Sequence, residues 1–338
     1  MNTLLMPKRT FFSVGNGLFA MEETDGIRSV YDCGGQNQPL IDKAILRAVN
    51  NRHVHIDNLF ISHYHKDHVN GLATLLSYCD VDRIILPMIP NLTRVLNYST
   101  IPGNYHYSAF VLNPYSYIQQ VSPDTKIIEI STDEEGGQND NGTRFENIDK
   151  DTVIHGKFSM CRQRDWLYVV YNRRSLSDEE LDSFLTKLGL DLDSSTDDII
   201  KKLRQKPGNT LLDSLKTVFS GKEMARLNDY SMTVWSGRAS DEKDGCFFTG
   251  DYNAKLHYKD LKMIYGHYLQ SSKIIQIPHH GSEYNFNDSI CHKQAIHVVS
   301  ASNGPYRGRQ IVNPDKVINQ LTAKGYQELD TRNGDVTI

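Results

Sequence analysis

The stretch SHYHKDHVNG, from Ser62 to Gly71, contains three histidines and an aspartate within six positions. A strand-like apolar run, IDNLFI, comes directly before it, and a run with the apolar spacing of a helix follows. A surface loop can hold several histidines by chance, but chance does not explain these ordered flanks. In an extended chain, residues i and i+2 point to the same side. His63 and His65 can therefore bind one metal ion together.

Asp67 and His68 follow at the point where the chain is expected to turn into the helix. Their side chains would face an adjacent position, so this turn can serve two metal ions. Neutral imidazole with carboxylate is the ligand set of catalytic zinc, and manganese or iron can also use it. Four residues cannot complete two coordination shells, so the remaining ligands must come from elsewhere in the chain.

Two later strand ends offer these ligands. The run FFTGDYN ends an apolar strand in Asp251, whose two oxygens could bridge two metals. The run IIQIPHHGSE ends another apolar strand in His279 and His280. All three groups follow the carboxyl ends of strands, where α/β sheets place their sites. We therefore expect them to meet around a pair of divalent cations, with zinc as the first choice and manganese as the second.

The composition is that of an ordinary globular protein of 338 residues, with 39% hydrophobic and 23% charged residues. The formal net charge of −4 does not favour polyanions, so nucleic-acid binding would need a local basic patch. The five cysteines form no CxxC pair, which favours a reducing compartment, here the cytoplasm. No apolar stretch reaches the roughly 18 residues of a membrane helix, so we expect neither a membrane span nor a signal peptide.

The chain begins with alternating strand and helix patterns, which predict a layered α/β fold. Residues 131–144 are polar and rich in Gly and Asn, and predict a mobile loop. Residues 173–227 predict an insert of three helices, which opens with a capping box at Ser177 and Glu180. This insert is either a cap packed on the core or a lid, which could also bind a protein partner.

Several motifs together resemble a known family. In order along the chain they are VYDCGG, LFISHYHKDHVNGL, LNDYSMTVW, FFTGD, IPHHGSE and DTRNGDVTI. The chain resembles the metallo-β-lactamase fold hydrolases, whose hallmark is HxHxDH followed by a late GD and a late histidine. It is most similar to the hydrolase domain of ComEC-type competence proteins and their free-standing relatives. The resemblance implies one domain over residues 1–338, built as a four-layer αββα sandwich with a helical insert.

The resemblance also implies roles for individual residues. Many members of the fold place a third first-metal histidine where this chain has Asn228 and Asp229. The first site is therefore expected either to hold a water or to use Asp229. The implied ligands are His63 and His65 for the first metal, Asp67 and His68 for the second, Asp251 as the bridge, and His279 as the last second-metal ligand, with His280 as its substitute or as a substrate contact.

The expected activity is that of a hydrolase in which a metal-bound hydroxide attacks a phosphodiester, as in a phosphodiesterase or a nuclease. Asp67 would orient the hydroxide, and a nucleic acid or a nucleotide would be the substrate. An ester, thioester or amide hydrolase of the same fold is one alternative. A catalytically silent binding or regulatory module is another, although the intact ligand set argues against it. Candidate substrate contacts are Asn228, Asp229 and Ser282, together with Lys66, Arg238, Lys255, Arg307 and Arg309 on loops near the expected mouth of the site.

Overall fold

The computed structural model describes residues 6–101, 103–131, 154–155, 158–303 and 313–338. The loop expected at 131–144 falls outside the described residues apart from residue 131, and so do Arg307 and Arg309. None of the described helices combines the length and the apolar composition that crossing a membrane requires.

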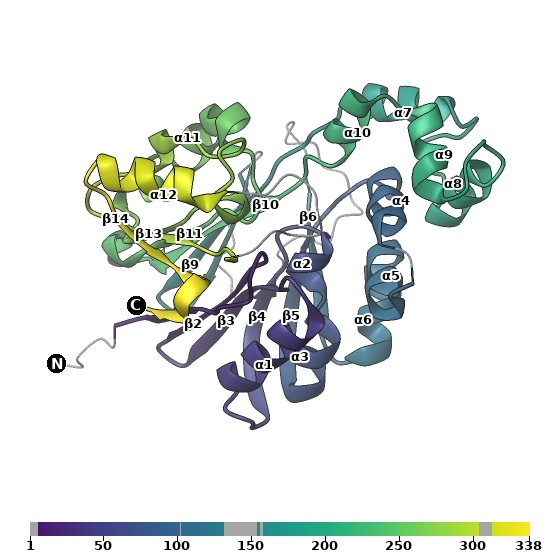
Figure 1. The fold of residues 1–338 in the computed structure, drawn as a ribbon. Coiled ribbons are helices and arrows are strands. Elements are labelled where there is room, and N and C mark those ends of the chain that lie inside the picture. Colours follow the sequence, from purple (N-terminus) through teal and green to yellow (C-terminus); the bar gives the residue numbers. More distant parts are fainter. Residues whose placement is uncertain (1–5, 102, 132–153, 156–157, 304–312) are drawn as a thin grey trace.

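Two β-sheets packed face to face form the centre of the protein, and helices cover their outer faces (Figure 1). The first sheet mixes antiparallel pairs near the N-terminus with parallel pairs from β3 (Ile27–Cys33) onward. In spatial order it contains β15 (Val336–Thr337), β1 (Lys8–Phe11), β2 (Phe19–Thr24), β3, β4 (Val54–Phe60), β5 (Cys79–Pro87) and β6 (Lys126–Ile130).

The second sheet has a parallel half and an antiparallel half. Its parallel half begins at β11 (Cys246–Phe248), which pairs with β12 (Ile274–Gln276). In spatial order this sheet contains β14 (Gln327–Asp330), β13 (Ile296–Val299), β12, β11, β10 (Met232–Arg238), β9 (Trp166–Asn172), β8 (Phe158–Gln163) and β7 (Ile154–His155).

The outer layers consist of helices that face one sheet each. The first sheet is covered by α1 (Gln38–Ala48), α3 (Leu72–Tyr78), α5 (Tyr105–Leu112) and α6 (Pro114–Val121), and the second by α11 (Ala254–Ser271) and α12 (Pro314–Ala323). Short 3₁₀ turns occur at Glu242–Asp244, His279–Gly281, Asp288–Ile290 and Thr331–Asn333.

Successive strand residues alternate between the apolar layers, as the period of two requires. On β3, Val30 packs with the helices of the first sheet, whereas Tyr31 packs between the two sheets. On β12, Ile274 packs between the sheets and Ile275 packs against α11 and α12. Three apolar layers therefore separate four layers of secondary structure, and the predicted αββα sandwich is confirmed.

Buried polar contacts also join the two sheets. The carboxylate of Glu22 accepts hydrogen bonds from Arg9 Nε at 2.6 Å, from Trp166 Nε1 at 3.0 Å and from Tyr31 Oη at 3.1 Å. The hydroxyl of Ser236 also donates to it. Because β1, β2 and β3 lie in one sheet and β9 and β10 in the other, these directional bonds help to set how the sheets align.

Backbone pairing brings three turns to one edge of the sandwich. Ser62 follows β4, Asp251 follows β11 and His279 follows β12. The backbone N–H of Met232 donates to the carbonyl oxygen of Ser62 at 2.7 Å, and that of His279 donates to Gly250 at 3.0 Å. The sandwich therefore holds these three segments, which lie far apart in the sequence, side by side.

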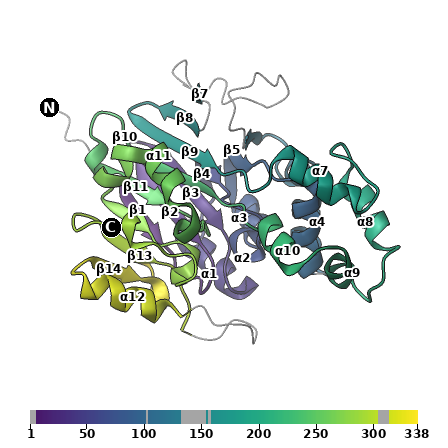
Figure 2. The same cartoon turned by 90° about the horizontal axis from the view of Figure 1, so that it is seen from above.

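The helical insert lies between β9 and β10 and packs on α4 (Asn91–Thr100), outside the two sheets (Figures 1 and 2). It contains four helices rather than the expected three, because Ser220 and Glu223 form a capping box that starts a new helix. Its apolar cluster joins Leu96 of α4 to Leu203 and Leu215 of the insert. The helices are α7 (Asp178–Thr186), α8 (Thr196–Leu203), α9 (Leu211–Val218) and α10 (Gly221–Leu227).

Candidate metal centre

The predicted ligands gather at this edge in two groups of donor atoms. Within each group, the candidate ligand atoms lie within 4.8 Å of one another. The second group begins at α2 (Lys66–Val69), the short helix that the histidine-rich turn forms. The first group is His63, His65 and Asp251, and the second is Asp67, His68 and His280.

Asp251 lies between the two groups. Its Oδ2 is 3.6 Å from His63 Nε2 in the first group. Its Oδ1 is 3.1 Å from His68 Nε2 and 3.6 Å from His280 Nε2 in the second. One carboxylate oxygen therefore faces each group, which is the arrangement that a bridging ligand needs.

The donor atoms of these groups fit a pair of cations. The Nε2 atoms of His63, His68 and His280 and the Oδ1 of Asp251 are buried and accept or donate no hydrogen bond among the described residues. His68 Nε2 comes within 3.1 Å of Asp251 Oδ1, but the two atoms are not aligned for a hydrogen bond. Buried polar atoms without partners are costly, and cations bound between them would remove that cost. The mixed nitrogen and oxygen donors suit zinc or manganese.

Asp32 orients one histidine of each group, and the sequence analysis did not identify it. Its Oδ2 accepts from His68 Nδ1 at 2.7 Å and from Ser62 Oγ at 2.6 Å, and its Oδ1 accepts from the Ser62 N–H at 2.6 Å. Since the Ser62 hydroxyl donates to the carboxylate, its oxygen accepts from His63 Nδ1–H at 3.0 Å. Both imidazoles are thus left with Nε2 toward the site. In the sequence, the feature that could have identified Asp32 is its position at the end of a strand, just before the Gly34-Gly35 turn.

The prediction that His279 belongs to the second group is wrong, because His280 occupies that place. The backbone takes positive φ angles of 49° at His279, 56° at His280 and 77° at Gly281. This left-handed turn points His280 inward, with 5% of its side chain exposed, and leaves His279 35% exposed. His280 Nδ1 points away from the site, 3.1 Å from the carbonyl oxygen of Ser300 and 3.3 Å from the Gly17 nitrogen, so its Nε2 faces Asp67 and Asp251.

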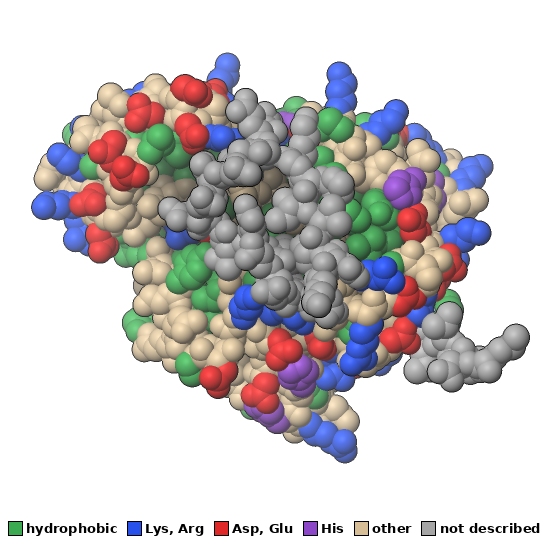
Figure 3. All heavy atoms as spheres, turned by 180° about the vertical axis from the view of Figure 1, so that it is seen from behind, with side chains coloured by type: hydrophobic (Ala, Val, Ile, Leu, Met, Phe, Trp, Pro, Cys, Tyr) green, Lys and Arg blue, Asp and Glu red, His purple; other side chains and the backbone are tan. Residues whose placement is uncertain are grey.

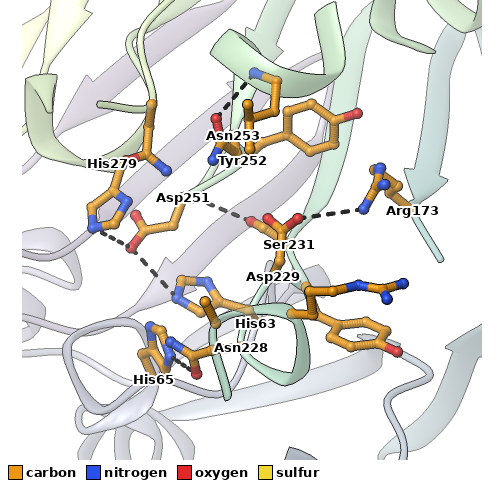
Figure 4. Close-up of a pocket in the computed structure, with 15 residues that line it drawn as sticks. His63, His65, Arg173, Asn228, Asp229, Ser231, Asp251, Tyr252, Asn253 and His279 are labelled. Atoms are coloured by element: carbon orange, nitrogen blue, oxygen red, sulfur yellow. Dashed lines mark hydrogen bonds and ion pairs between the residues drawn. The ribbon is translucent and has the colours of Figure 1, made fainter. Parts of the chain in front are cut away.

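His279 lies on the other side of Asp251, next to the first group. Its Nε2 is 3.7 Å from Asp251 Oδ2, the same oxygen that faces His63 (Figure 4). Its side chain also lines the pocket described below, where it can contact a substrate.

Comparisons with known proteins found similar solved structures but no match in sequence. No protein-family model matches the chain, and no curated protein matches it in sequence. The chain is similar to Igni18, a metallo hydrolase from Ignicoccus hospitalis, with 10% identity, a TM-score of 0.46 and 98% of each chain covered. It is similar to the metallo-β-lactamase fold protein YhfI from Bacillus subtilis, with 7% identity, a TM-score of 0.44, and 98% of this chain and 99% of that chain covered.

A third similar structure is a diphosphatase from the PhnP family. It shares 10% identity and a TM-score of 0.41, with 98% of this chain and 97% of that chain covered. At these identities and TM-scores, the substrates of the three proteins do not transfer to this chain.

The charges around the site move the pKa values of its histidines in opposite directions. Burial lowers the pKa of His63 well below its ordinary value, and the neighbouring imidazoles of His68 and His65 lower it further. Burial also acts to lower the pKa of His68, but the carboxylates of Asp251 and Asp32 outweigh it and raise that pKa well above its ordinary value. Without a cation, a proton on His68 therefore supplies positive charge between the two carboxylates.

Cation binding should release this proton. A metal ligand must be deprotonated, and His68, with its raised pKa, holds a proton around neutral pH in the metal-free protein. Affinity for zinc should therefore rise with pH up to the raised pKa of His68, by about tenfold per pH unit for each proton released, and level off above it. Calorimetric titrations in two buffers of different ionisation enthalpy measure the released protons. An affinity that stays constant from about pH 6 to pH 8, with no released proton, would contradict the expectation.

A pocket of about 310 Å³ opens beside the first group. One wall comes from α10 of the insert and the residues after it, including Asn228 and Asp229. The facing wall comes from Tyr252, Asn253 and the start of α11 (Figure 4). The insert is therefore part of the pocket and not only a cap on α4.

The other candidate substrate contacts divide into two sets. Asn228 and Asp229 line the pocket, but Asp229 lies outside both donor groups and instead pairs with His257 at 2.9 Å and Arg173 at 3.5 Å. Ser282 is buried, and its N–H donates to the carbonyl oxygen of His279 at 2.9 Å, as in a turn.

The remaining basic candidates come from three different elements. Lys66 is the first residue of α2, and Lys255 Nζ donates to the carbonyl oxygen of Glu283 at 3.2 Å. The expectation that Arg238 lies near the mouth is wrong. It sits at the far end of β10 from Ser231, buried and paired with Asp25 at 2.7 Å.

Proposed function

We propose that the protein is a metal-dependent hydrolase of the metallo-β-lactamase type that uses two divalent cations, zinc or manganese, and is related to the ComEC-type hydrolases. One observation carries this proposal: Asp251 lies between two groups of donor atoms, and the Nε2 atoms of their buried histidines have no hydrogen-bond partner among the described residues. His63, His65 and Asp251 would hold the first cation, and Asp67, His68, Asp251 and His280 the second.

When bound, such cations would lower the pKa of a water molecule and stabilise the negative charge that develops on the scissile group. Asp67 would orient the attacking water. Burial acts to raise its pKa, but the imidazoles of His280 and His68 outweigh burial and hold it well below the ordinary value. Asp67 is therefore a carboxylate at neutral pH and can accept a hydrogen bond from that water. His279, which faces the pocket, can donate a hydrogen bond to a substrate oxygen.

We propose a phosphodiester as the bond that is cleaved, in a nucleotide or at the end of a nucleic-acid strand. The pocket volume of about 310 Å³ lies near the lower end of the range for ligand pockets, which is roughly 300–1,000 Å³, and favours a compact substrate. On the face shown in Figure 3, the described lysines and arginines are interspersed with acidic residues, so they form no continuous basic surface of the kind that a long polyanion needs.

Two further proposals concern the surroundings of the enzyme. The five cysteines are all buried as free thiols, which supports a reducing compartment such as the cytoplasm. The insert could still bind a protein partner on its outer face. Because its inner end lines the pocket, such a partner would act close to the substrate.

A substrate panel tests the proposal. Protein freed of metal by a chelator and then reloaded with zinc or manganese would be offered bis(4-nitrophenyl) phosphate, 4-nitrophenyl acetate and a thioester. Hydrolysis of the phosphodiester that disappears on chelation and returns with metal supports the proposed reaction. Activity on the esters alone would favour the ester, thioester or amide hydrolase, and bound metal without turnover of any substrate would favour a silent binding module.

A further inference from the structure

We infer that Asn228 is a positioning residue for His65, and that the helical insert organises the first metal site through it. This inference rests on the proposed role of the two groups in binding cations. Asn228 Oδ1 lies 2.9 Å from His65 Nε2. An amide oxygen can only accept a hydrogen bond, so His65 Nε2 carries the hydrogen and Nδ1 keeps the lone pair that can bind a cation.

This tautomer is the reverse of the one found at His63 and His68. Both use Nδ1 as the donor and present Nε2 to the site. Their partners are Ser62 and Asp32 of β3, whereas the partner of His65 is the C-cap of the last helix of the insert. The first group is therefore the one whose geometry depends on the insert.

Asn228 is held in place by the last helix of the insert. It is the C-cap of α10, and its N–H donates to the carbonyl oxygens of Met224 at 3.1 Å and Ala225 at 3.2 Å. The helix is tied to α7 by Arg226, whose two terminal nitrogens each donate to the Glu180 carboxylate at 2.7 Å. A bidentate pair of this kind fixes both distance and orientation.

The residues on either side of α10 add further ties. The hydroxyl of Ser175, just after β9, donates to the carbonyl oxygen of Arg226 at 2.8 Å. Asp229, the residue after Asn228, pairs with Arg173 from the same end of β9 (Figure 4). The amide of Asn228 thus reaches His65 from a segment anchored at both ends, which is what a positioning residue requires.

The decisive experiment titrates zinc into the metal-free protein and its Asn228→Ala, Asn228→Asp and Asn104→Ala variants. Competition with a chromophoric chelator follows both binding steps. Loss of a partner that orients a ligating histidine weakens metal binding by about 10- to 100-fold, and we expect about tenfold here because Asn228 is exposed. In Asn228→Ala, the loss should be confined to one of the two sites. Asn228→Asp keeps an acceptor and should restore binding.

Asn104→Ala is the matched control, since it removes a helix-capping amide that accepts from the Tyr107 N–H at 3.0 Å, at the start of α5 and outside the pocket lining. A general loss of stability would weaken both sites, or would weaken binding in the control as well. Equal zinc affinities of Asn228→Ala and the unaltered protein at both sites would overturn the inference. An unaltered protein that binds no zinc would instead overturn the proposed function.

A spectroscopic readout tests the tautomer without any metal. In the metal-free protein, nitrogen-15 NMR of the imidazoles above their titration range should show His65 with its hydrogen on Nε2. The Asn228→Ala variant should shift His65 toward a mixture of tautomers, whereas Asn228→Asp should not. A hydrogen on Nδ1 of His65 in the unaltered protein would overturn the inference even if both metal sites bind normally.

Discussion

Asp251→Asn should abolish hydrolysis and weaken the binding of both cations. We expect the rate to fall by at least about 10³-fold, because removing even one electrostatic contact to a reacting centre costs about 10²- to 10³-fold. We expect zinc affinity to fall by more than about 100-fold, which is the upper limit for loss of a group that only orients a ligand. Asparagine keeps the size of the side chain, so the change isolates the charge and the second acceptor oxygen.

The size of this effect follows from the position of Asp251 between the groups. Its two oxygens face His63 on one side and His68 and His280 on the other. The surrounding histidines, His279 foremost, hold its pKa well below the ordinary value against the opposing effect of burial, so that it is a carboxylate at neutral pH. An amide would bring its NH2 group toward one set of histidines, in place of the oxygen that would bind the cation there, and could occupy an Nε2 lone pair that the cation needs.

Steady-state rates on the phosphodiester reporter and zinc titrations measure these two losses. Asp260→Asn is the matched control, because Asp260 is an aspartate of α11 that pairs with Arg173 at 3.3 Å and lies outside both donor groups. It should keep zinc affinity. Zinc binding by Asp251→Asn that equals that of the unaltered protein would refute the bridging role.

Asp32→Asn should weaken the second site and destabilise the metal-free protein. The buried carboxylate of Asp32 accepts three hydrogen bonds, from His68 Nδ1, Ser62 Oγ and the Ser62 N–H. An amide has one acceptor oxygen, and its NH2 group must face a donor. Leaving buried donors unpaired beside a charged imidazole should cost about 3 kcal/mol of the free energy of unfolding. Zinc affinity should fall by about 10- to 100-fold.

This substitution is informative because the backbone tolerates it. Asp32 has a φ of 54°, in the left-handed region that asparagine adopts as readily as aspartate. Urea unfolding of the metal-free proteins gives the stability difference. Asp57→Asn is the control, because Asp57 accepts from the Arg28 N–H at 2.8 Å and from Gln163 at 3.2 Å and belongs to neither of the two groups around Asp251. In the metal-free protein this substitution should cost less than about 1 kcal/mol. Equal losses in the two variants would mean that Asp32 has no special role.

Local patterns predicted much of the arrangement of the candidate ligands. The alternation of side chains along an extended chain placed His63 and His65 together, and the strand, turn and helix around them follow from periodicity over a few residues. The apolar strands that precede Asp251 and the His279-His280 pair were likewise predicted from short apolar runs in the sequence. The αββα layering followed from the order of these elements together with the resemblance to a known fold.

The remaining features depend on contacts between distant residues or on single backbone angles. The left-handed turn at His279 and His280, which exchanges their roles, is set by how the loop packs and not by the pattern HHGS. Asp32 reaches His68 across 36 positions because β3 and β4 are parallel neighbours, and no local spacing encodes that pairing. The amide of Asn228 reaches His65 across 163 positions because the insert docks on α4.

The sequence by itself therefore determined which side chains could bind cations, since that depends on residue type and on periods of two to four residues. Only the tertiary structure decided which nitrogen of each histidine faces the site, which of two adjacent histidines is used and which residues orient them. The physical reason is that hydrogen bonds act over about 3 Å, so they depend on sheet order and helix docking that no short stretch of the chain contains.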